Sequence, residues 1–166
     1  YFRPLKIPKM KKIKKILLIL LVLFIAAQIF GPKRNLGDIA SVEPFLKETN
    51  PPEDVKIILK ESCYDCHSSN TRYPWYNNIT PVNYWLESYI SDGKKHFNMS
   101  EWDGSSLKRK DHKFEDLIEA IEKKWMPLDE YTWMHADAKL TDVQTKAVVD
   151  WAKQVRFKYS LEAKPE

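Results

Sequence analysis

The only two cysteines of the chain stand close together, and a histidine follows the second one directly. Cys63 and Cys66 are separated by two residues, and His67 comes next. This is the C-x-x-C-H spacing of covalent haem attachment. It brings both sulfur atoms within reach of the two vinyl groups on one porphyrin edge, and the adjacent imidazole can turn under the ring to bind iron. The motif therefore predicts one covalently attached haem c, held by Cys63 and Cys66, with His67 as the proximal axial ligand.

Three other roles for the cysteine pair remain open but fit less well. A redox-active pair of the thioredoxin type needs a preceding strand, whereas the residues before Cys63 have a helical pattern. A structural zinc site needs two further ligands, and the remaining histidines show no paired spacing. A structural disulfide across so short a turn would constrain little of the chain.

A second axial ligand for the iron must come from later in the chain. The methionine and histidine candidates are Met99, Met126, Met134, His96, His112 and His135. Met126 is preferred because Pro127 follows it and because it lies 59 residues after His67, between two predicted helices. A thioether favours reduced iron and raises the reduction potential. The alternatives are His135 as the distal ligand, which would lower the potential, and Met126 as ordinary core packing.

The charge of the chain is unevenly distributed. Nine of the 27 Lys and Arg residues precede residue 37 and no acid accompanies them, so the remaining 18 face all 23 acids and carry a net charge of −5. A mildly acidic main part does not support nucleic-acid binding. All six tryptophans lie between Trp75 and Trp151, within this acidic part, and rings of this size indicate a packed core rather than disorder.

The N-terminal segment resembles a membrane signal. Four lysines between Lys11 and Lys15 precede a largely apolar run from Ile16 to Phe30. This pattern predicts a basic cytoplasmic stub and a membrane anchor or signal segment over residues 1–31, and no clear cleavage site favours removal. We therefore expect a single transmembrane helix in a bacterial cytoplasmic membrane, with the rest of the chain facing the periplasm or the cell exterior.

The remaining residues predict a small all-α, cytochrome c-like domain. Residues 32–49 have the composition of a linker, residues 50–158 form the expected haem-binding domain, and residues 159–166 a tail. Helical periodicity and capping signals predict four helices. The first, second and fourth start near Asn50, Thr80 and Thr141, with Gly93 ending the second. The third has one apolar stripe formed by Phe114, Leu117, Ile118, Ile121 and Trp125. Only four glycines are present, which disfavours a turn-rich β-fold.

Several stretches resemble a known family. The order of the C-x-x-C-H motif, the Met126-Pro127 pair and a final amphipathic helix resembles monohaem class I cytochromes c. The stretch from Cys63 through Tyr73-Pro74-Trp75-Tyr76 to Val82 is similar to the bacterial haem-binding domain family with a C-x-x-C-H motif. So is the later stretch from Met126 to Leu140. The resemblance implies a covalent haem with Cys63, Cys66 and His67 in the roles given above.

These observations predict a membrane-anchored monohaem c-type protein that transfers electrons, and they favour an electron carrier over an enzyme. The expected partner is a redox protein. The alternative is a haem-based sensor or peroxidase-like enzyme with an open distal site, which gains support if Met126 is not a ligand. A third alternative is an assembly module whose cysteines act without haem.

Overall fold

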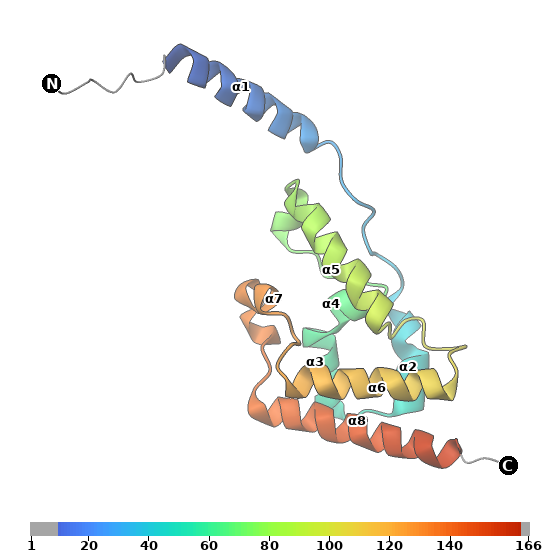
Figure 1. The fold of residues 1–166 in the computed structure, drawn as a ribbon. Coiled ribbons are helices and arrows are strands. Elements are labelled where there is room, and N and C mark those ends of the chain that lie inside the picture. The colour runs from blue at the N-terminus through green and yellow to red at the C-terminus, as the bar shows by residue number, and fades with distance from the viewer. Residues whose placement is uncertain (1–9, 164–166) are drawn as a thin grey trace. The chain divides into compact units, whose positions relative to one another are not determined.

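The computed structural model describes residues 10–163, and these residues are predominantly helical (Figure 1). The helices are α1 Met10–Ala27, α2 Glu43–Thr49, α3 Glu53–Ser62, α4 Tyr64–His67, α5 Val82–His96, α6 Leu107–Glu122, α7 Asp129–Met134 and α8 Asp142–Glu162, with short 3-10 helices η1 Ile39–Val42, η2 Trp75–Asn78 and η3 Ala136–Ala138. In the described part of the chain, extended pairing is limited to one isolated bridge between Leu36 and Asn70. The predicted all-α class is confirmed.

The described residues separate into two compact units. The first contains residues 10–34 and 74–87, and the second contains residues 35–73 and 88–163. Within the first unit, the Gln28 side chain pairs with the Thr80 backbone in both directions. Its Oε1 accepts the Thr80 N–H at 2.9 Å, and its Nε2 donates to the Thr80 carbonyl at 3.2 Å. This exchange joins the segment after α1 to the start of α5.

The predicted transmembrane helix is not found. Helix α1 ends at Ala27 and includes the four lysines in its first six residues. Its apolar part, from Ile16 to Ala27, would span about 18 Å, whereas a bilayer core is roughly 30 Å thick. Among residues 10–163, no helix combines the length and apolar character that crossing a membrane requires. The prediction of a transmembrane anchor was therefore wrong, and so was the location that depended on it. Residues 1–9, part of the predicted stub, lie outside the described residues.

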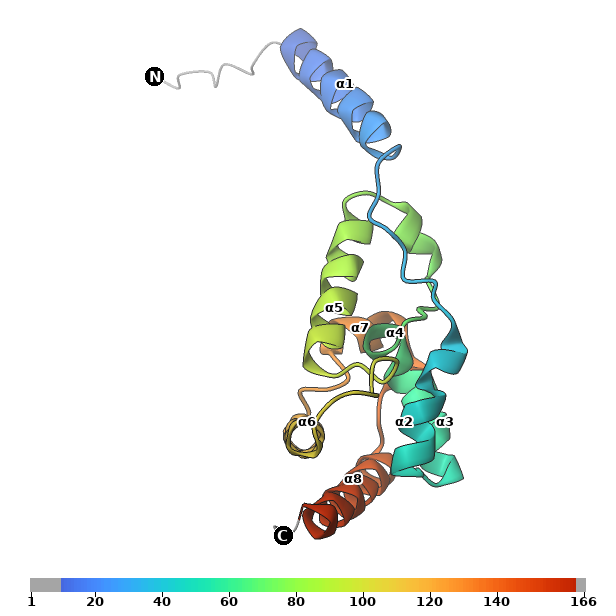
Figure 2. The ribbon, with the colours of Figure 1, turned by 90° about the vertical axis from the view of Figure 1, so that its right-hand side faces the viewer.

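The core of the second unit is built around α6 and α8, which lie against each other (Figure 1), with α3 packed on α8. Its centre is a group of buried aromatic rings, mostly in edge-to-face contact: Phe45, Phe97, Trp102, Phe114 and Trp151. The view in Figure 2 looks nearly along α6 and shows α2 and α3 beside it. Edge-to-face geometry matches the charge distribution of aromatic rings and adds to the stabilisation from burial.

The helix boundaries agree with the sequence pattern at some ends and differ at others. The predicted capping box at Thr141 is confirmed, since its Oγ1 accepts the Gln144 N–H and the Gln144 side chain accepts the Thr141 N–H. Asn50 does not cap α3. It closes α2 in the left-handed conformation, with φ of 41°, which asparagine tolerates better than most residues. Helix α3 then begins at Glu53.

The folded second unit extends beyond the predicted residues 50–158. Helix α2 forms within the expected linker, and its Phe45 is fully buried in the aromatic core. Helix α8 continues to Glu162, with Tyr159 buried. These two large side chains supply apolar area at the ends of the sequence range, which explains why the flanking segments fold with the domain.

Candidate haem site

The C-x-x-C-H motif lies where α3 ends and the single-turn helix α4 begins. Cys63 separates the two helices, and its carbonyl accepts the N–H groups of Cys66 and His67 at 3.2 and 2.9 Å. Both cysteines are free thiols. Burial, together with the neighbouring Cys66 for Cys63 and Asp65 for Cys66, raises the pKa of each thiol to about 12. Both thiols are therefore protonated at neutral pH, held in place on a helical scaffold.

His67 is held in the tautomer that an iron ligand requires. Its Nδ1 donates to the Phe97 carbonyl oxygen at 2.8 Å. A carbonyl can only accept, so the proton is on Nδ1 and the lone pair is on Nε2. Burial lowers the pKa of His67 below its ordinary value, with the backbone contacts opposing that shift. The neutral imidazole is the form that coordinates metals.

A cavity of about 420 Å³ opens beside the motif. Cys63, His67 and Met126 all line it. Most of the remaining lining is apolar and comes from α3, α6 and the segments that follow α5 and α6: Leu59, Phe97, Leu117, Ala120, Trp125 and Pro127. The volume lies within the range of cofactor and ligand pockets, and a mainly apolar wall with few polar groups is typical of them.

Met126 reaches the cavity through the turn that ends α6. Lys124 adopts a left-handed conformation with φ of 57°. The N–H of Trp125 bonds the Ala120 carbonyl at 2.9 Å, and that of Lys124 bonds the Ile121 carbonyl at 3.1 Å. This pair of bonds defines a Schellman C-cap, which reverses the chain and satisfies the last helical carbonyls. The reversal brings Trp125 and Met126 back against the helix, where both line the cavity.

The other predicted distal ligands divide into two groups. Met99 and His96 also line the cavity, although Met99 is only 1% exposed and packs in the core. His112, Met134 and His135 are not among the lining residues. The ring of His135 stacks on Tyr131 with centroids 4.5 Å apart. The geometry thus brings Met126, rather than His135, to the same cavity as His67.

Two features of the site had no clear signal in the sequence. Gly93 does not end α5, which runs to His96. A Cβ at this glycine would lie 2.7 Å from the Cys66 carbonyl oxygen, so its missing side chain lets α5 approach the motif. Asp65, between the two cysteines, is buried and bonded to Arg72 and Tyr131. A glycine in a helical pattern suggests a helix end, and an aspartate in the variable part of a motif suggests nothing specific.

The alternative of a structural zinc site gains no further ligands from the structure. Across residues 10–163, no group of three or more His, Cys, Asp or Glu side chains is arranged to hold a metal ion. The apolar wall next to His67 suits a porphyrin face better than a tetrahedral ion, which would need polar ligands on all sides.

Comparison with known proteins identifies the family. No curated protein and no solved structure matches the chain. Residues 22–154, which include the motif, the cavity lining and Met126, match the haem-binding domain family. The matched segment covers most of the chain, and the cavity beside His67 agrees with the chemistry of the family. The chain therefore belongs to the haem-binding domain family, and it binds haem.

Proposed function

We propose that this protein is a c-type cytochrome that binds one haem covalently and carries single electrons. Cys63 and Cys66 would each add a thiol across one vinyl group to form a thioether. His67 Nε2 and the Met126 sulfur would supply the two axial ligands. The observation that carries the proposal is the convergence of Cys63, His67 and Met126 on one apolar cavity.

The surroundings of the cavity favour electron transfer over chemistry on a bound substrate. Haem would supply one-electron chemistry, and with His67 and Met126 both bound to the iron no position would remain for a substrate. The Phe97 carbonyl fixes the orientation of the His67 ring, which limits rearrangement between oxidation states. The Met126 side chain and the apolar lining of the cavity would both favour reduced iron.

The deciding experiment is production of the full chain in a host that attaches haem c, followed by a denaturing gel stained for haem and optical spectra in both redox states. We expect covalent haem, a low-spin six-coordinate spectrum and the weak far-red band of an iron–sulfur ligand. The double variant Cys63→Ala/Cys66→Ala should lose haem on the gel. Met126→Ala should lose only the far-red band.

A matched control separates ligation from a general effect of losing a methionine. Met134 is exposed on α7 and does not line the cavity, so Met134→Ala should keep the far-red band. A wild-type spectrum that is five-coordinate and high-spin, and that changes on adding carbon monoxide or peroxide, would contradict electron carriage and support the sensor or peroxidase alternative. Haem that leaves the chain on the gel would contradict covalent attachment.

A further inference from the structure

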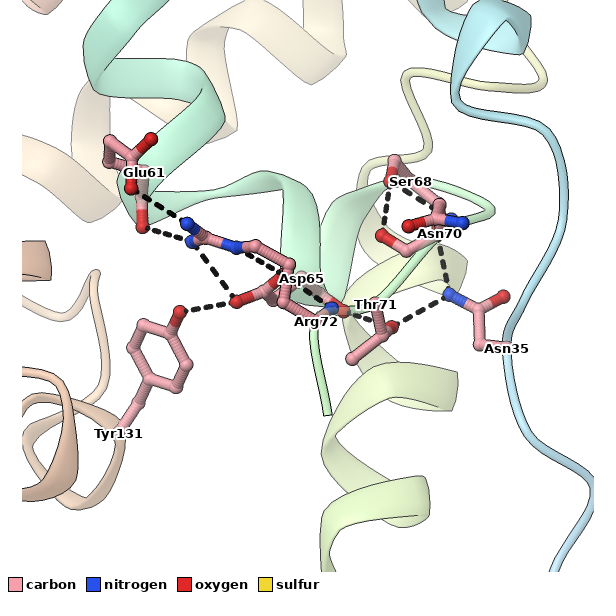
Figure 3. A network of polar contacts seen from close by, with 8 residues as sticks. All are labelled: Asn35, Glu61, Asp65, Ser68, Asn70, Thr71, Arg72 and Tyr131. Carbon is pink, nitrogen blue, oxygen red and sulfur yellow. Dashed lines mark hydrogen bonds and ion pairs between the residues drawn. The ribbon is translucent and has the colours of Figure 1, made fainter. Parts of the chain in front are cut away.

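A buried carboxylate lies inside the haem-attachment motif. Asp65 stands between Cys63 and Cys66 and is only 5% exposed. Figure 3 shows its carboxylate at the centre of a polar network formed by Glu61, Arg72 and Tyr131. A buried charge is costly unless it is paired and hydrogen-bonded, so these partners determine whether the motif keeps its shape.

Arg72 provides the compensating charge. Its backbone N–H and Nε donate to Asp65 Oδ1 at 2.9 and 3.2 Å, and its Nη2 donates to Oδ2 at 3.2 Å. The same guanidinium reaches back to α3, where Nη1 pairs with the Glu61 carboxylate at 2.7 Å. All these hydrogen bonds to Asp65 come from Arg72, which is close to it in the sequence. Oδ2 can still accept one more hydrogen bond.

That additional donor comes from a distant part of the sequence. The Tyr131 hydroxyl donates to Asp65 Oδ2 at 2.7 Å. Tyr131 belongs to α7, and none of the six residues of that helix is buried. Pro127 and Leu128 are all that separate Met126 from α7. The hydroxyl therefore links the motif that carries His67 to the segment that carries Met126.

We propose that the Tyr131–Asp65 hydrogen bond is a latch that holds α7 against the attachment motif and keeps the Met126 sulfur at the iron. The inference rests on the proposed function, since it takes Met126 as the distal ligand. Tyr131 is a positioning residue in this scheme and does not itself touch the cofactor. A helix without buried side chains has little apolar packing to keep it in place, so one charge-assisted hydrogen bond has a large effect on its position.

The test uses Tyr131→Phe in the haem-loaded full chain. Phenylalanine keeps the ring that stacks on His135 and removes only the hydroxyl. A hydrogen bond to a charged group changes an equilibrium by about tenfold or more, so carbon monoxide should bind the ferrous variant at least about tenfold faster than wild type. The far-red band should disappear at a lower temperature, while the gel still shows covalent haem. Asp65→Asn, which weakens the same bond from the other side, should shift both quantities in the same direction.

Tyr159→Phe is the matched control. The Tyr159 hydroxyl also donates to a carboxylate, Glu48 Oε1 at 2.6 Å, but in the core and outside the cavity lining. This variant should lower overall stability without changing the carbon monoxide rate relative to wild type. If the far-red band and the carbon monoxide binding rate are unchanged in Tyr131→Phe, the latch is overturned but Met126 ligation is not. A wild-type protein without that band would overturn Met126 ligation, and the latch with it.

Discussion

The aromatic core and the cavity beside His67 in the second unit are made of similar side chains, but the chain fills the core and leaves the cavity open. In the core, the ring of Phe114 is fully buried and lies 5.3 Å from Trp151 and 6.2 Å from Phe45. In the cavity, Trp125 is 57% exposed and about 420 Å³ is left open. Apolar surface left uncovered costs free energy. The chain therefore completes the aromatic core by itself, whereas the apolar walls of the cavity are suited to being covered by a bound group.

Phe97 belongs to both regions. Its ring contacts Trp102 at 5.6 Å and Phe45 at 5.8 Å, inside the core. Its carbonyl accepts the hydrogen bond from His67. A packed core resists displacement of its side chains. The aromatic core therefore determines the orientation of His67, the proposed proximal ligand, although its imidazole lines the cavity.

Filling the cavity is the most severe test of the comparison. Ala120 lines the cavity from α6, and Ala120→Phe should place a ring in the space that haem needs. We expect haem on the stained gel to fall to background. Without haem, the free energy of unfolding should stay level or rise by about 1 kcal/mol, because the substitution fills an existing void.

The matched control is Ala152→Phe. Ala152 is fully buried in the core, so the same enlargement should destabilise the protein by roughly 1–3 kcal/mol or more through overpacking. If Ala120→Phe retains haem at the wild-type level, the cavity is not the haem site. If both variants are equally destabilised, the two regions do not differ in packing.

The next largest effect is expected from truncation along α6, which contributes to both regions. Phe114→Ala should lower the free energy of unfolding by about 3–5 kcal/mol, because it opens a cavity in a filled core. Leu117 is partly buried and lines the existing cavity, so Leu117→Ala should cost clearly less in the haem-free protein, roughly 1–2 kcal/mol. Urea unfolding of both haem-free variants measures the difference, and equal losses would contradict the comparison.

The sequence predicted haem binding, which the family match supports, and the local arrangement of the motif, but not the surroundings of the motif. The spacing of Cys63, Cys66 and His67 is local, and a single helical turn is sufficient to bring them together. The capping box at Thr141 is local too, and it is confirmed. Gly93 and Asp65 depend on segments far away in the sequence, so their roles become visible only when α5 and α7 are placed against the motif.

The wrong prediction of a transmembrane helix has a physical cause as well. Hydropathy describes composition but not where a helix begins and ends. The prediction took the whole apolar run from Ile16 to Phe30 as helix, but α1 stops at Ala27 and the Gln28 side chain pairs with Thr80 instead. The four lysines lie inside the helix, which shortens its apolar part further.

We expect the free energy of unfolding to depend on pH through Glu48, a carboxylate that bonds to the buried core residue Tyr159. The Glu48 carboxylate accepts bonds from Lys110 Nζ and the Tyr159 hydroxyl, each at 2.6 Å. Burial raises the pKa of Glu48, but these bonds outweigh it and hold the pKa below the ordinary 4.5. A lowered folded pKa stabilises the protein fully above the ordinary value, and that stabilisation disappears as the pH falls through the folded value. The free energy of unfolding should therefore decrease below about pH 5.

Lys110→Met isolates this contribution. At pH 7 it should cost about 1–2 kcal/mol, since it leaves a partly buried carboxylate without its charged donor, and it should flatten the decrease below pH 5. Lys146→Met provides the control, because Lys146 and Asp150 form an exposed pair on α8 that contributes little. Urea titrations at several pH values measure both. A wild-type acid slope that persists in Lys110→Met would show that other carboxylates cause it.

The smallest effect is expected at the turn that delivers Met126 to the cavity. The left-handed conformation of Lys124 costs about 1 kcal/mol of folding free energy, and glycine would avoid this cost. The exposed ion pair between Lys124 and Asp142, at 3.5 Å, contributes little to stability. Lys124→Gly should therefore raise the free energy of unfolding by roughly 0.5–1 kcal/mol. Lys123→Gly, at the neighbouring position with φ of −82°, should lower it. If Lys124→Gly were destabilising, the lysine side chain would hold the turn, and the cavity side would depend on contacts there rather than on backbone conformation.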